Sequence, residues 1–161
     1  MWTSSNTLGI NIDGYQLDEN EGRSRVVRDF SDKYNIKFTN GKFCRYDFTA
    51  TDIENPSNTF VGEVKCYHKN PRPYTKYPDY QIDYDKLESI CKAADEQGAQ
   101  PVLIVYFSDI AVLWNLNNFD WRSTKKWKNV NKDGQNWGKE KERALQVYLR
   151  KENGEWWKEM K

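Results

Sequence analysis

A continuous apolar run at residues 101–107 constrains the fold of this chain most strongly. Its sequence, Pro-Val-Leu-Ile-Val-Tyr-Phe, leaves no polar face, as is typical of a β-strand buried on both sides. A helical pattern at 85–97 precedes it, and a strand pattern at 59–67 precedes the helix. A strand–helix–strand unit of this kind places its two strands parallel in one sheet, with a right-handed crossover. The sequence therefore predicts a mixed sheet with helices on its faces.

The helix at 85–97 has the strongest local signals. Asp85 and Glu88 have the spacing of a capping box, and Gly98 is a typical helix stop. Its apolar residues recur at helical spacing: Leu87, Ile90, Cys91 and Ala94.

Two further helices are expected, one at each end of the chain. Residues 17–34 begin with acidic side chains, which suit a helix N-terminus, and continue with an apolar stripe. These are Asp18, Glu19 and Glu21, then Val26, Val27, Phe30 and Tyr34. Residues 138–150 are predicted to form a final helix with Ala144, Leu145, Tyr148 and Leu149 on one side.

The remaining elements are predicted strands. Asn40-Gly41 is a two-residue hairpin signal that joins an incoming strand at 36–39 to an aromatic strand at 42–50. A turn cluster at 54–57 leads into the strand at 59–67. Residues 111–116 are expected to pair with the apolar run, and residues 8–12 to form a short strand.

A carboxylate and an ammonium group share one face of the strand at 59–67. Glu63 and Lys65 are two residues apart, so they point to the same side of the strand. On these two residues alone, an ordinary cross-strand ion pair on the solvated face of an antiparallel sheet is the favoured interpretation. Asp47, however, ends the preceding aromatic strand and is expected to lie near Glu63 across the ladder.

Asp47, Glu63 and Lys65 give the chain a resemblance to the PD-(D/E)XK nuclease superfamily, although Tyr46 stands where that motif often has proline. The resemblance covers about two thirds of the chain. It implies the restriction-endonuclease-like α/β (α+β) fold, an αβββαβ core with a mixed sheet of about four to five strands flanked by helices. Members include restriction enzymes, Holliday junction resolvases and phage nucleases, and the small ones often act as homodimers.

The same resemblance implies a mechanism. Asp47, Glu63 and the backbone carbonyl of Val64 would hold Mg²⁺, for which Mn²⁺ often substitutes, and Lys65 would stabilise charge on the phosphate. An acid of the first helix often joins the metal, here Glu21 with Glu19 as the alternative. Gln81 matches a glutamine that orients substrate or water in many relatives. Helix-dipole complementarity and helix-entry packing remain alternatives for these additional residues.

Charge is distributed unevenly over the 161 residues. Residues 122–161 contain 12 Lys and Arg against 6 Asp and Glu, whereas the whole chain carries a net charge of +1. An acidic body with a basic, aromatic tail suits a metal site beside a polyanion-binding surface, and a solvated tail explains the tail equally well. We expect a single domain, with a core at about 17–116 and an extension at about 117–161.

Two basic segments are the candidate DNA contacts. The loop at 68–78 combines basic side chains with tyrosines, and 117–137 interleaves lysines with tryptophans. Their candidate residues are His68, Lys69, Arg72, Lys76, Lys125, Lys126 and Lys128. For the second segment, a tryptophan-anchored loop packed on the body is an equal alternative.

Composition limits the other classes of function. The sequence has neither a membrane-spanning apolar run nor a signal-peptide pattern, which predicts a soluble protein of the cytoplasm, or of the host cytoplasm for a phage protein. Three cysteines without Cys-x-x-Cys spacing predict neither a disulfide framework nor a zinc site. The function classes are a Mg²⁺-dependent DNA endonuclease acting on branched or other DNA, an exonuclease, a non-catalytic DNA-binding protein and a protein-binding factor.

Overall fold

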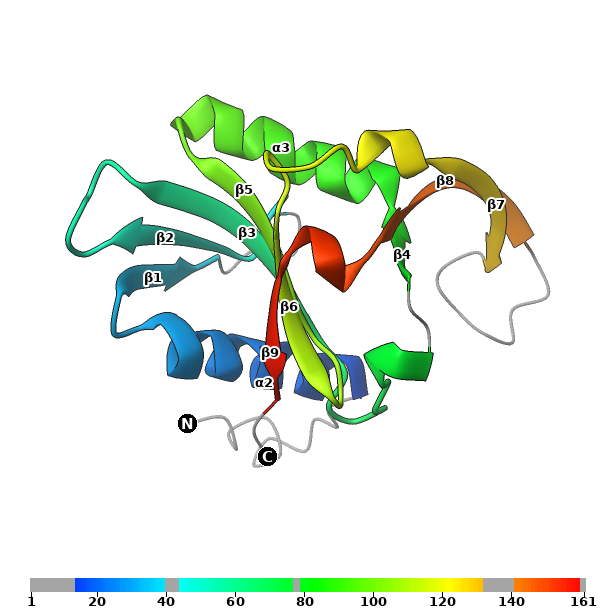
Figure 1. Cartoon of the computed structure of the whole chain (residues 1–161), viewed down its shortest axis with the longest axis horizontal. Helices are drawn as coiled ribbons and strands as arrows, with labels where there is room; N and C mark the ends of the chain where they lie inside the picture. The colour runs from blue at the N-terminus through cyan, green and yellow to red at the C-terminus, as the bar shows by residue number, and fades with distance from the viewer. Residues whose placement is uncertain (1–13, 40–43, 77–78, 132–140, 160–161) are drawn as a thin grey trace, which may run out of the picture.

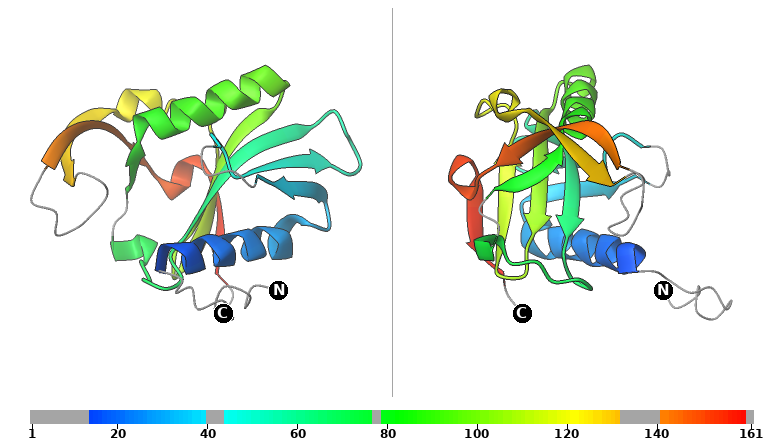
Figure 2. Two further views of the ribbon diagram at one scale, coloured as in Figure 1. Left: turned by 180° about the vertical axis from the view of Figure 1, so that it is seen from behind. Right: turned by 90° about the vertical axis from the view of Figure 1, so that its right-hand side faces the viewer.

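The computed structural model describes residues 14–39, 44–76, 79–131 and 141–159, and its centre is a six-stranded sheet (Figure 1). The strand order is β1-β2-β3-β5-β6-β9, in which β3 and β5 are parallel and the other neighbours antiparallel. Helices α2 and α3 lie on opposite faces of this sheet (Figure 2). The bounds are α2 Gly14–Phe30, β1 Tyr34–Phe38, β2 Phe48–Asp52, β3 Thr59–Cys66, α3 Tyr84–Gln97, β5 Gln100–Tyr106, β6 Ile110–Asn115 and β9 Glu155–Lys158.

Alternation along β3 and β5 divides the core into two layers. Val61, Leu103 and Val105 face α3, whereas Val64 and Ile104 belong to the layer under α2. The apolar run predicted from sequence is buried from residue 101 to residue 107, as expected for an inner strand covered on both faces.

Two glycines let neighbouring elements approach β3 closely. A Cβ on Gly62 would lie 2.4 Å from the Phe48 ring and 2.8 Å from Val102. A Cβ on Gly22 of α2 would lie 3.1 Å from the Cβ of Cys66. Both contacts fix the strand that carries Glu63 against its surroundings.

A second sheet, β4-β8-β7, projects beside α3 (Figure 1). It consists of β4 Tyr80–Asp83, β7 Lys126–Asn131 and β8 Lys141–Leu149, and 3₁₀ turns lie at Tyr74–Lys76, Arg122–Thr124 and Lys151–Asn153. The helix predicted at 138–150 is therefore wrong, because β8 pairs with both β4 and β7. Val147 and Leu149 are buried at alternate positions, as is typical of a strand. The spacing of the apolar residues in the sequence is compatible with a helix as well, which explains the error.

Other boundaries also differ from the predictions. The helix α2 ends at Phe30, so Tyr34 begins β1 instead of closing the helix. The aromatic strand begins at Phe48, which pairs with Phe38, and Asn40-Gly41 lies outside the described residues, as does the strand predicted at 8–12. The N-cap of α3 is Asp83, without a side-chain capping bond, so the predicted capping box is wrong. Gly98, with φ 64°, ends that helix as predicted.

The sheet also exceeds the predicted four to five strands, because β9 pairs with β6 at its edge. Among the described residues, no helix is long and apolar enough to cross a membrane.

Candidate active site

The two predicted acids meet where β2 begins beside β3. Phe48 pairs with Gly62, so Asp47 lies opposite Glu63 in the antiparallel ladder. The Asp47 amide donates to the Gly62 carbonyl at 2.8 Å. The amide of Val64 donates to Asp47 Oδ2 at 2.9 Å, which orients this carboxylate toward β3. The structure thus brings together Asp47, Glu63 and Val64, as predicted.

Glu63 is buried, and its two carboxylate oxygens have different surroundings. Oε2 lies 2.9 Å from Nζ of Lys86 and 3.8 Å from Nζ of Lys65. Oε1 is buried and has no hydrogen-bond partner among the described residues. Leaving an anionic oxygen buried and unpaired is costly, so this atom indicates a site for a ligand.

The pKa of Glu63 reflects this environment. Burial raises it most, and the neighbouring Asp47 carboxylate raises it further, to about 7. The ammonium groups of Lys86 and Lys65 act in the opposite direction. A buried acid beside a second acid is the arrangement in which a divalent cation compensates unfavourable charge.

A cavity of about 280 Å³ opens beside the two acids. It is lined by the two acids and by side chains from α2, β3 and β4: Asp18, Glu19, Asp47, Glu63, Val64, Lys65, Cys66, Tyr67 and Tyr80. Burial raises the pKa of the Cys66 thiol to about 12, so this cysteine stays protonated and is a poor nucleophile. The hydroxyls of Tyr67 and Tyr80, which also line the cavity, lie 3.1 Å apart.

The donor set fits a hard cation. Mg²⁺ prefers oxygen ligands and retains several waters, so it needs only a few protein oxygens. Asp47 and Glu63 supply carboxylates. The carbonyl of Val64 emerges on the same strand edge as the Val64 amide that binds Asp47. Within the described residues, no three His, Cys, Asp or Glu side chains gather tightly enough to form a cage, so water would complete the shell.

The two candidate acids of α2 have different positions. Glu19 lines the cavity and lies 3.5 Å from Arg23. Glu21 is not among the residues that line the cavity, and it pairs with Arg25 at 2.9 Å. The structure therefore brings the alternative, Glu19, to the site, and separates Glu21 from it.

Gln81 also lies away from the acids. It neighbours Tyr80 on β4, but its side chain bonds Gln146 at 3.2 Å and accepts from Lys128 Nζ at 2.9 Å. Because adjacent strand residues face opposite ways, Tyr80 faces the cavity and Gln81 does not.

The basic residues of the loop after β3 have different environments. His68, Lys69 and Lys76 are exposed, and the His68 and Lys69 amides donate to Asp18 Oδ1, which fixes the loop to α2. Arg72 is half-buried, and its guanidinium packs against the rings of Tyr67 and Tyr80. Arg72 thus supports the cavity wall, whereas His68, Lys69 and Lys76 lie at the surface of the loop.

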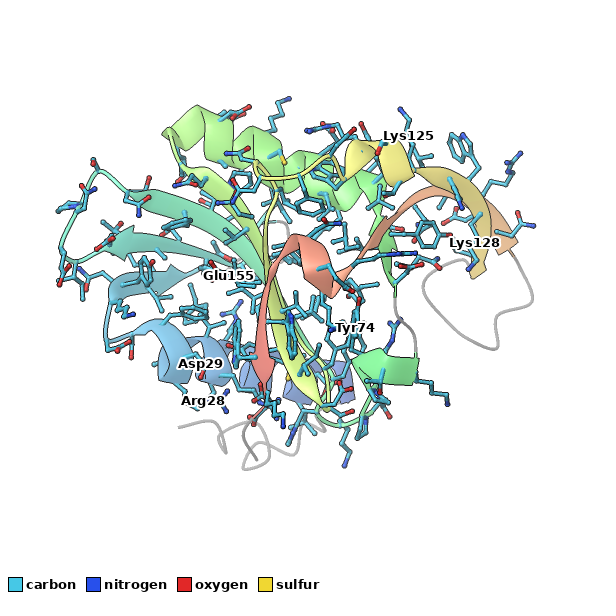
Figure 3. The ribbon with its side chains drawn as sticks, viewed as in Figure 1. Arg28, Asp29, Tyr74, Lys125, Lys128 and Glu155 are labelled. Carbon is cyan, nitrogen blue, oxygen red and sulfur yellow. The ribbon has the colours of Figure 1, made fainter. Side chains whose placement is uncertain are left out.

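Lys126 and Lys128 belong to β7, and Lys125 directly precedes it. The labelled Lys125 and Lys128 lie well separated from Arg28 and Asp29 of α2 (Figure 3). All three lysines are exposed, and Trp127 between them is 60% exposed. The alternative of a tryptophan-anchored loop applies to Trp121, which is fully buried, and not to Trp127.

Sequence reasoning missed Lys86, Asp18 and Tyr80. Lys86 lies in the first turn of α3. Only the crossover from β3 through α3 to β5 brings it close to Glu63. Asp18 was noticed only as a charge at a helix start. The sequence signal available for Lys86 was a lysine in the first turn of a helix, where the helix dipole disfavours it.

Comparisons with known proteins support the fold. No family model matches the sequence, and no curated protein matches it. Among solved structures, the chain is similar to Hjc, a Holliday junction resolvase from the archaeal hyperthermophile Archaeoglobus fulgidus. The TM-score is 0.50 at 12% identity, over 82% of this chain and 92% of that chain. The chain therefore has a nuclease-like α+β fold, as predicted, and the likeness extends no further than the fold.

Proposed function

We propose that this protein is a metal-dependent deoxyribonuclease that hydrolyses DNA phosphodiester bonds endonucleolytically, with branched DNA as the leading substrate. The observation that carries the proposal is the buried Glu63 carboxylate beside Asp47, with one oxygen left without a partner. The nuclease-like fold supports the reaction class, and the resolvase neighbour supports the choice of branched DNA.

Asp47, Glu63 and the Val64 carbonyl would hold Mg²⁺, or Mn²⁺ in its place. When bound, the cation polarises the scissile phosphate and lowers the pKa of an attacking water.

The chain itself contributes orientation and charge. The Val64 amide holds the Asp47 carboxylate in position, and burial restricts the movement of the Glu63 side chain. Lys65 is one third exposed on the same strand face as Glu63, so its ammonium can reach a phosphate at the cavity mouth. There it would stabilise the negative charge that develops on the phosphorane.

DNA binding would extend from the cavity over two basic surfaces. One is the exposed loop with His68, Lys69 and Lys76, and the other is the projecting ribbon of β7 and β8. A backbone crossing between them would pass the acids, with Lys125, Lys126 and Lys128 contacting phosphates.

The test is cleavage of labelled DNAs: a four-way junction, a flap, a single strand and a linear duplex. Each is incubated with Mg²⁺, with Mn²⁺ and with chelator. Asp47→Asn and Lys65→Ala are compared with Asp32→Asn and Lys92→Ala, which alter exposed side chains. We expect metal-dependent cutting that is lost only in the first two variants and is strongest on branched DNA. Cutting by Asp47→Asn at the wild-type rate would contradict the proposal, and release of single nucleotides would indicate an exonuclease.

One observation favours a second candidate, a non-catalytic DNA-binding protein on the same fold. Lys86 and Lys65 already place two ammonium groups at Glu63, as in a charge cluster that never takes up metal. DNA binding without cleavage in either metal would select this candidate. A protein-binding factor would instead show no DNA binding whose affinity falls with salt.

A further inference from the structure

Lys86 is the closest cation to the buried acid, and it comes from outside the acid-x-lysine strand. It lies in the first turn of α3, where the next residue, Leu87, is fully buried and directs this turn toward the sheet. Its Nζ is 2.9 Å from Glu63 Oε2, compared with 3.8 Å for Lys65. The Lys86 side chain is one third exposed, so it reaches the acid from the solvent side.

This contact gives the two oxygens of the Glu63 carboxylate different surroundings. Lys86 holds Oε2, whereas Oε1 has no partner among the described residues. A buried carboxylate next to Asp47 needs compensating positive charge, and Lys86 is the nearest source of it in the metal-free protein. A divalent cation bound between the two acids would lie within a few ångströms of this ammonium, where like charges repel strongly in a poorly solvated site.

We propose that Lys86 is the resident counter-ion of Glu63, and that it sets the metal concentration at which the site fills. The inference rests on the metal site of the proposed function. Lys86 stabilises the metal-free protein and weakens metal binding, so that removing its charge tightens the binding of Mg²⁺. A lysine that merely oriented Glu63 for the metal would have the opposite effect, because its loss would weaken binding.

The test measures Mg²⁺ binding alone, without DNA, by calorimetric titration and by thermal unfolding over a series of Mg²⁺ concentrations. Lys86→Met keeps most of the aliphatic stem and removes the charge, and Lys86→Arg keeps the charge. Lys92→Met, an exposed lysine of the same helix, is the matched control. We expect the Mg²⁺ midpoint of Lys86→Met to fall about tenfold, because about one unit of repulsive charge is removed. Lys86→Arg and Lys92→Met should keep the wild-type midpoint.

Thermal unfolding provides the second readout. Lys86→Met should have a lower unfolding temperature than wild type without metal, and the difference should narrow at saturating Mg²⁺. An unchanged or higher midpoint in Lys86→Met overturns the inference, and so does a wild type that binds no Mg²⁺. Cleavage assays report separately on the proposed function. If Lys86→Met has a lower Mg²⁺ midpoint but the wild type never cuts DNA, the counter-ion role is supported and the nuclease function is rejected. If the wild type cuts DNA but the Mg²⁺ midpoint of Lys86→Met is unchanged, the nuclease function is supported and the counter-ion role is rejected.

Discussion

Two glutamates with buried side chains, Glu63 on β3 and Glu159 after β9, differ in the charges that surround them. Their side chains are 5% and 3% exposed, and each has one oxygen without a partner among the described residues. Glu159 pairs with Arg28 at 2.8 Å and with Arg25 at 3.4 Å. Glu63 pairs with two lysines and faces Asp47.

The difference lies in the charges around each acid. Arginine is always charged, and its planar fork holds a carboxylate in a fixed geometry. The hydrogen bonds and charges of Asp29 and Glu159 raise the pKa of Arg28, so the acids of this cluster are paired with arginines, although Oε2 of Glu159 has no partner among the described residues. Glu63 instead has a second acid beside it and flexible lysines, and its pKa is raised to about 7. Burial alone therefore does not distinguish the two acids, whereas burial beside another acid gives Glu63 the environment on which the proposed function rests.

The largest predicted effect separates the two glutamates by activity. Glu63→Gln should lower the DNA cleavage rate by about 10³-fold or more, because under the proposed function it removes a metal ligand and its charge. Glu159→Gln should cleave within about threefold of wild type but lose about 2 kcal/mol of unfolding free energy, because its hydrogen bond from Arg28 and its ion pair with Arg25 weaken. Cleavage rates and urea unfolding of both variants provide the measurement. Equal losses of activity in the two would end the distinction between a reactive acid and a structural one.

The second prediction concerns pH. The pKa of Glu63 rises from 4.5 to about 7 on folding, so between these values the folded protein binds more protons than the unfolded chain. Without metal, the Glu63 contribution to stability should therefore be fully present below pH 4.5 and decrease by about 3 kcal/mol as pH rises to 7.

Urea unfolding at pH 5 and pH 8 in chelator measures this contribution. Glu63→Gln should lack that part of the pH dependence, whereas Glu159→Gln should retain it, so that other titrating groups cancel in the comparison. A pH dependence that is the same in wild type and Glu63→Gln would show that the Glu63 pKa is close to normal.

Much of the fold follows from local sequence. The apolar run of β5, the periodicity of α3 and the stop at Gly98 were each sufficient to predict their elements. The failures occurred where tertiary pairing decides the state. Residues Ala144, Leu145, Tyr148 and Leu149 fit one side of a helix, yet β4 and β7 flank this segment and pair with it as β8. Local spacing cannot contain that information.

The site divides in the same way. The proximity of Asp47, Glu63 and Lys65 was predictable because two neighbouring antiparallel strands bring them together, a relation set by short sequence separation. Lys86 reaches the same carboxylate through a crossover helix, so its role depends on how α3 lies on the sheet. For the same reason, helix periodicity could not decide which acid of α2 faces the cavity.

The third prediction compares a packed side chain, Arg72, with an exposed one, Trp127, on the proposed DNA-binding surface. Arg72 packs between tyrosine rings, whereas Trp127 is exposed among lysines, with the guanidinium of Arg143 over its ring at 5.7 Å. Trp127→Ala should weaken DNA binding by about tenfold without loss of stability, because it removes an exposed ring that would stack on bases under the proposed function. Lys126→Ala should instead reduce the salt dependence of the DNA affinity by the equivalent of about one phosphate contact. Fluorescence anisotropy over a salt series measures both. Unchanged affinity in Trp127→Ala would exclude the ribbon from the interface.

The smallest predicted effect concerns Glu21, which belongs with the ion pairs around Glu159. Arg25 bonds both Glu21 and Glu159, so Glu21 belongs to the structural group although it is only three residues from Asp18 at the cavity. Glu21→Gln should cleave DNA within about twofold of wild type and lose about 0.3–0.5 kcal/mol of stability, as is usual for a helical ion pair four residues apart. Glu19→Gln, at the cavity, should raise the Mg²⁺ concentration needed for half-maximal cleavage. Titrating Mg²⁺ against both variants decides which acid of α2 serves the metal, and a larger shift in Glu21→Gln than in Glu19→Gln would reverse the assignment.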